Sequence, residues 1–136
     1  KTMDITHFDD FLAAARQQNE PQRLLFTFAV AELPGDANAA QKAAFERGEG
    51  GALVPAVCVD KALDELSTFA AFAQEAEQFS LDWVIVFAAS LSGRNGTPPS
   101  AADAEEPIKR MVAMIKAGDV RSLLPFNRQG EPVQLG

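Results

Sequence analysis

Residues 83–89 read Trp-Val-Ile-Val-Phe-Ala-Ala, an unbroken apolar run that a polar loop follows. Aromatic and β-branched residues dominate the run, and its length is that of a strand rather than a helix. A strand that is apolar at every position is typical of a sheet with both faces covered. The run therefore predicts a central strand in a sheet that carries helices on both faces.

The segment before this run predicts a crossover between two strands. Leu53–Val59 is a second apolar run, and its Pro55 favours a sheet edge or a bulge, because proline cannot donate a ladder hydrogen bond. Asp60 is expected to cap a helix whose apolar stripe extends from Leu63 to Phe79. Two strands joined by a helix are expected to be parallel neighbours in a right-handed crossover.

Five further segments complete the predicted order. They are a helix over 6–18, a strand over 24–30, a marginal surface helix over 37–47 with Phe45 as its large apolar anchor, a helix from Pro107 to Gly118, and a hairpin about the turn Asn127–Gly130. The alternation predicts one α/β domain spanning residues 1–136. We expect a layered fold with a mixed, mostly parallel sheet of about four to five strands, flanked by about three to four helices, and a C-terminal β-hairpin.

Composition excludes several classes of partner. The chain has 136 residues, 47% of them apolar, and a formal net charge of −7. That length is typical of one domain with its own core. The negative charge repels phosphate backbones and anionic lipid surfaces, so we expect no nucleic-acid partner and no membrane binding. No apolar run approaches the roughly 20 residues of a membrane-spanning helix.

Cysteine and histidine are too scarce for the common catalytic and metal sites. Cys58 is the only cysteine, which excludes an intrachain disulfide and a cysteine-rich metal site and favours a reducing compartment. Because no basic stretch precedes an apolar leader, we expect a cytoplasmic protein. His7 is the only histidine, and the acids Asp9 and Asp10 beside it are explained by the dipole of a starting helix. We predict no metal site, no cofactor and no catalytic residues.

The best candidate site is the polar loop that follows the central strand. In open α/β sheets, ligands collect at the carboxyl ends of strands. This rule selects seven candidate ligand-binding residues: Asp60, Ser90, Ser92, Gly93, Arg94, Asn95 and Gly96. Arg94 and the backbone amides suit an anion, but the spacing matches neither GxxxxGK[ST] nor GxGxxG. The alternative is a turn in which asparagine and glycine supply positive φ angles.

Three stretches together look like a small proteobacterial family whose members are called "ribonucleotide reductase subunit alpha". They are Gln22–Phe26, the block Gly50–Pro55 with Cys58–Lys61, and Pro125–Gly130, and the resemblance extends over the full length. The resemblance implies no catalytic residues in this chain. A catalytic subunit of that enzyme needs a radical-forming cysteine and a reducing cysteine pair, whereas this chain has one cysteine, Cys58. An accessory association with the enzyme stays open.

Three functions remain open at this point. The first is a non-catalytic protein-interaction or regulatory module that acts through a surface patch or loop. The alternative is a small-molecule or nucleotide/phosphate-binding protein, catalytic or not, that uses the Ser90–Gly96 loop together with Asp60. The third is self-association through an edge strand near Pro55 or through the terminal hairpin.

Overall fold

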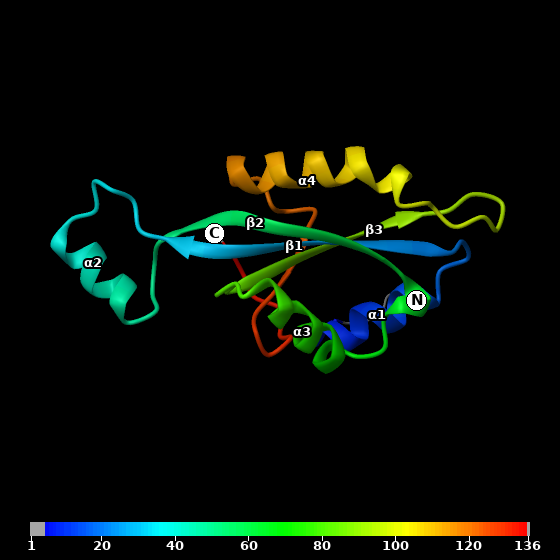
Figure 1. The fold of residues 1–136 in the computed structure, drawn as a ribbon, viewed down its shortest axis with the longest axis horizontal. Coiled ribbons are helices and arrows are strands. Elements are labelled where there is room, and N and C mark those ends of the chain that lie inside the picture. The colour runs from blue at the N-terminus through cyan, green and yellow to red at the C-terminus, as the bar shows by residue number, and fades with distance from the viewer. Residues whose placement is uncertain (1–4, 136) are drawn as a thin grey trace.

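Four strands form one open sheet in the computed structural model, which describes residues 5–135. In chain order they are β1 (Gln22–Glu32), β2 (Ala52–Ala62), β3 (Ile85–Ser92) and β4 (Leu124–Phe126). Their order across the sheet is β2-β1-β3-β4, and all three neighbouring pairs are antiparallel. The molecule is thus an α/β fold with an antiparallel sheet (Figure 1).

The prediction of a mostly parallel sheet is wrong. β2 and β3 do run in the same direction, but β1 lies between them and pairs with both. The cause is the segment between β1 and β2, which carries α2 (Ala39–Glu46). A crossover helix must bury a face on the sheet, whereas every residue of α2 stays at least partly exposed. The chain therefore folds straight back as a hairpin, and α2 projects beyond the end of the sheet (Figure 1).

Helices cover both faces of the sheet. On one face lie α1 (Phe8–Arg16) and α3 (Phe69–Ala76), and on the other lies α4 (Glu105–Ala117) (Figure 1). Because side chains alternate along a strand, β1 contributes to both sides. Phe26 and Phe28 pack in the cluster with α1 and α3, whereas Leu25 packs in the cluster with α4.

The core beneath α1 and α3 is aromatic. Phe8, Phe26 and Phe72 come from three different elements and form a triangle, with ring centroids 5.6, 4.6 and 5.2 Å apart. Phe8 and Phe26 are fully buried. Rings at these separations stabilise the fold beyond the area they bury, so this cluster fixes α1 and α3 on the sheet.

The predicted helix after Asp60 begins later than expected. β2 continues through Asp60 to Ala62, and α3 begins only at Phe69, where the Thr68 hydroxyl accepts a hydrogen bond from the Ala71 amide at 3.2 Å. Asp60 is therefore a strand residue and not a helix cap. The carboxylate–guanidinium contact explains the difference, because Arg23 on β1 binds Asp60 at 2.6 Å and holds it in the ladder.

Pro55 marks both an edge and a bulge. β2 is the outer strand of the sheet, as the proline predicts. Phe28 pairs with Val57 and Ala29 with Pro55, so Ala56 has no partner in the register. The bulge lets the strand continue past a residue that cannot donate a hydrogen bond.

The expected terminal hairpin is reduced to a turn and one bridge. The Gly130 amide donates to the Asn127 carbonyl at 3.0 Å, which closes the turn. Beyond it, Phe126 and Pro132 form an isolated bridge rather than a paired strand. Pro132 lacks an amide hydrogen, which limits further pairing. No helix within residues 5–135 is both long and apolar enough to cross a bilayer.

Candidate functional site

The candidate loop is a tight two-residue hairpin turn. Arg94 and Thr97 exchange both of their backbone hydrogen bonds, at 3.0 and 2.9 Å. Between them, Asn95 has a φ of 51° and Gly96 a φ of 79°, as a type I′ turn requires. A side chain at Gly93 would bring its Cβ to 2.2 Å from the Thr97 carbonyl oxygen. Glycine is therefore needed at 93 for close approach and at 96 for its backbone angle.

The chain itself already uses the backbone donors of this turn. The Gly93 amide donates to the Pro21 carbonyl at 2.8 Å, and the Gly96 amide donates to the Glu20 carboxylate at 2.8 Å. An anion bound to the Gly96 amide would have to displace Glu20. The carboxylate of Glu20 thus binds the turn at the place where the sequence suggested a bound anion.

The structure separates the seven candidate residues. Ser92 lies at the end of β3, where its hydroxyl accepts a hydrogen bond from the Gln22 side chain at 2.7 Å. Asp60 lies on β2 and is bound to Arg23, with its side chain 25% exposed. The carboxyl ends of β2 and β3 lie at the same end of the sheet. However, β1 lies between the two strands and separates their backbones by about 10 Å. Asp60 is not among the residues that line the cavity next to the turn.

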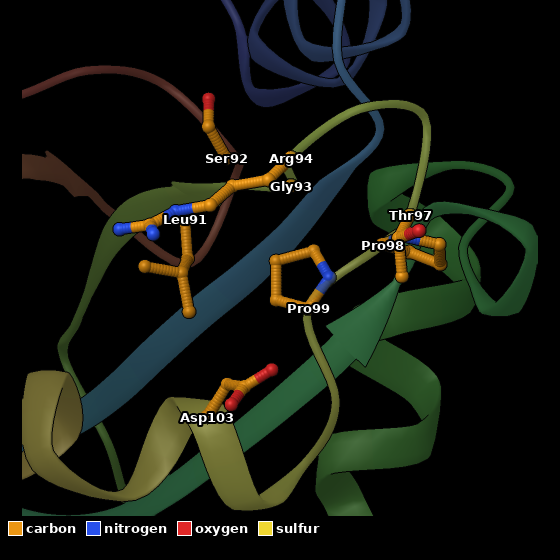
Figure 2. A pocket seen from close by; sticks show the side chains of 8 residues that line it. All are labelled: Leu91, Ser92, Gly93, Arg94, Thr97, Pro98, Pro99 and Asp103. Carbon is orange, nitrogen blue, oxygen red and sulfur yellow. The ribbon is translucent and has the colours of Figure 1, made fainter.

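That cavity has a volume of about 400 Å³ and mixes both charges (Figure 2). Its lining consists of Leu91, Ser92, Gly93, Arg94, Thr97, Pro98, Pro99 and Asp103. Hydrogen bonds from the Ser100 amide and hydroxyl, together with the charge of Arg94, hold the pKa of Asp103 below its usual value, against a smaller opposing effect of desolvation. The cavity therefore contains a carboxylate as well as a guanidinium.

A second feature, which the sequence did not predict, lies along β3. β4 pairs only with Val86–Ala88, the first half of β3. Within the described chain, Ala89–Ser92 have β1 on one side and no strand on the other. This free edge of β3 is a row of backbone groups without ladder partners.

A groove lies beside the free edge. It has a volume of about 200 Å³ and is lined by Leu25, Ala89, Ser90, Leu91, Pro107, Arg110, Met111, Met114 and Leu123. One wall is β3 and the opposite wall is α4. Met111 was predicted as a core residue of α4, but Arg110 and Met114 carried no local signal for a binding wall. We call this feature the β3–α4 groove.

Histidine and cysteine take structural positions. The Asp9 amide donates to Nδ1 of His7 at 3.1 Å, which caps α1. Nε2 of His7 lies 3.1 Å from the Gln129 carbonyl oxygen, which can only accept, so Nε2 carries the proton. Sγ of Cys58 lies 3.3 Å from the Thr27 hydroxyl oxygen. Among residues 5–135, no three His, Cys, Asp or Glu side chains gather as metal ligands.

No family model, curated protein or solved structure matches this chain. The resemblance to the proteins called ribonucleotide reductase subunit alpha stays a prediction. Any functional argument therefore rests on the geometry of the chain itself.

Proposed function

We propose that this chain is a non-catalytic protein-interaction module that binds an extended segment of a partner as an added strand on the free edge of β3. The observation that carries the proposal is the short β4, which pairs with only Val86–Ala88. In an antiparallel ladder, alternate residues direct both backbone groups towards each side. Part of Ala89–Ser92 therefore offers donors and acceptors to a new strand. Such main-chain bonds provide affinity in strand-addition complexes.

The β3–α4 groove supplies a place for side chains of the added strand. Met111, Met114 and Leu123 contribute apolar side chains to its lining, as do Leu25, Ala89 and Leu91 of the sheet. Its volume of about 200 Å³ is below the range typical of drug-sized ligands and suits a single side chain. Methionine adapts to differently shaped apolar partners, which favours recognition of peptide segments.

The opposite edge of the sheet is less suited to strand addition. β2 carries Pro55 and the unpaired Ala56, and both features protect an edge from pairing. Lys61 on β2 is ion-paired with Glu75 of α3. Ala89–Ser92, by contrast, contain no proline and no charged residue. The comparison favours β3 as the edge that binds.

Selection from a displayed library of random peptides tests the proposal. Enriched peptides are added to the purified chain, and amide hydrogen exchange is measured with and without them. We expect alternate amides within 89–92 to become protected on binding. The proposal fails if no peptide is enriched, or if enriched peptides leave exchange at 89–92 unchanged.

A second candidate function is binding of a small anion in the cavity beside the turn. It is favoured by Arg94, which lines the cavity and has no ion-pair partner among residues 5–135. Asp103 in the same lining opposes a second negative charge, so this candidate ranks below the first. Thermal unfolding with added inorganic phosphate tests it. A stabilisation that Arg94→Ala abolishes and Arg121→Ala retains would favour anion binding.

A further inference from the structure

We propose that the cavity between the C-terminal end of α4 and the start of β2 binds a small molecule with an aliphatic chain and a single carboxylate. We call it the α4–β2 cavity. It shares no lining residue with the β3–α4 groove or with the cavity beside the turn, so the proposal is independent of strand addition. Two features lead to it: apolar walls, and one lysine in the lining.

Small residues at the end of α4 leave the α4–β2 cavity open. Figure 1 shows the C-terminal end of α4 near the end of the sheet where β2 begins. The helix ends at Ala117, and Gly118 follows as its C-cap; both residues line the cavity. A Cβ added at Gly118 would meet nothing within 4 Å. The helix end therefore supplies no large side chain to fill the space beside the sheet.

Apart from one lysine, every residue of the lining is apolar or glycine. Phe87 and Ile115 are buried members of the cluster with α4, whereas Leu53, Val120 and Leu135 pack against that cluster and stay partly exposed. The cavity has a volume of about 470 Å³, which lies within the range typical of small-molecule sites. An aliphatic chain in the cavity would bury the exposed parts of these side chains, and the gain grows with the apolar area removed from water.

Lys116 provides the one charged group of the lining. It has no ion-pair partner among residues 5–135. The chain already uses the amides at the helix end. The Gly118 amide donates to the Ile115 carbonyl at 3.1 Å, and the Asp119 amide donates to the Met114 carbonyl at 2.9 Å. One ammonium group without neighbouring free amides matches a singly charged carboxylate better than a phosphate, which is typically held by several donors.

The negative groups near the helix end are weaker than the charge of Lys116. The helix dipole places about half a negative charge at the C-terminus of α4, against the full positive charge of the lysine. Asp119 lies 3.4 Å from the Arg121 guanidinium, which offsets its charge. These charges together favour an anionic head group beside Lys116.

The test titrates simple amphiphiles into the chain labelled with ¹⁵N. The probes are hexanoate, octanoate and decanoate, and the controls are octylammonium and 1-octanol. Amide chemical shifts give the place of binding and the dissociation constant together. The titrations are done at about 0.15 M salt, where charges further than about 8 Å from the head group are largely screened.

We expect the shift changes to concentrate on 115–120 and on 52–53. Each added methylene should tighten binding by about twofold to fourfold, fourfold being the value for complete burial. Octanoate should bind about threefold more tightly than octanol and about fivefold more tightly than octylammonium, as expected for one solvent-exposed ion pair. An affinity independent of chain length, or octylammonium binding as tightly as octanoate, would overturn the proposal.

Charge reversal at one residue tests the role of Lys116. Lys116→Glu should invert the preference, so that octylammonium binds more tightly than octanoate. The matched control is Lys109→Glu, at an exposed position of α4 outside the lining, and it should keep the preference for octanoate. An unchanged preference in Lys116→Glu would contradict the assignment of the head group.

A second copy of the chain is the competing occupant. In that case the shifts of 115–120 would change on dilution of the protein alone, and octanoate would cause no further change. That result would make this face an interface between copies and would overturn the proposal. Strand addition on β3 is unaffected by either outcome, because its test measures the amides of 89–92.

Discussion

Replacing Gly93 by alanine tests whether the candidate loop is a closed structural turn. The added Cβ would lie 2.2 Å from the Thr97 carbonyl oxygen and 3.0 Å from the Pro21 carbonyl oxygen. Backbone would have to move by roughly 1 Å or more to restore normal van der Waals contact. That movement strains the two hydrogen bonds between Arg94 and Thr97. Overpacking and weakened hydrogen bonds together predict a loss of about 2–4 kcal/mol in the free energy of unfolding.

Gly96→Ala is the matched control in the same turn. Nothing lies within 4 Å of a Cβ at that position, but the φ of 79° is unfavourable for alanine. The expected loss is about 1 kcal/mol. With a typical urea m-value of about 2 kcal/mol per molar, the unfolding midpoint should fall by about 1–2 M for Gly93→Ala and about 0.5 M for Gly96→Ala. A midpoint for Gly93→Ala equal to or above that of Gly96→Ala would refute the closed turn.

Three further perturbations test the surrounding structure. Phe8→Ala should lower the free energy of unfolding by about 4 kcal/mol, because the Phe8 ring is fully buried. Phe79 is 37% exposed, so Phe79→Ala should lower it by only about 1 kcal/mol. Urea titration of both variants compares the two losses. His7→Ala removes the cap of α1 and should cost about 1 kcal/mol, also by urea titration; an unchanged midpoint would contradict the capping role. Hydrogen bonds from Thr6 hold the pKa of Asp10 below its ordinary value of 3.8, with a smaller favourable contribution from His7. The ionised Asp10 carboxylate therefore stabilises the folded state above pH 3.8, and this stabilisation is lost as the pH falls through the lowered pKa. Asp10→Asn should therefore flatten the fall in stability measured by urea titration at acidic pH, and an unchanged slope would contradict this.

Local pattern was sufficient to predict individual elements of the fold. The spacing of Ile108, Met111 and Ile115 predicted α4, and Gly118 ends that helix with a φ of 76°. The composition of 83–89 predicted a strand, although Trp83 precedes β3 and is buried against the core instead. Helices on both faces also followed from that run. These features depend on residues that are close in sequence.

The order and direction of the strands could not be predicted from residues that are close in sequence. They depend on whether α2 covers the sheet, and its small residues, with Phe45 resting over Gly51, do not bury a face. Asp60 was expected as a cap because the sequence does not reveal that Arg23 lies on the neighbouring strand. Its position in β2 follows from a contact between residues far apart in the chain.

The candidate site was predictable only in part. Asn95 and Gly96 predict a turn, and both residues have positive φ angles in the structure. The free edge of β3 depends on where β4 begins, and the packing of Leu123 in the cluster with α4 sets that position. No periodicity in the sequence predicts how many residues of β3 pair with β4.

Hydrogen exchange of the unliganded chain tests the central claim most directly. If the edge of β3 beyond Ala88 is free, the outward-facing amides of 89–92 exchange rapidly, while the amides of 86–88, which lie between β1 and β4, remain protected. Uniform slow exchange from 85 to 92 would show that another part of the chain already covers this edge, and the proposed binding site would not exist.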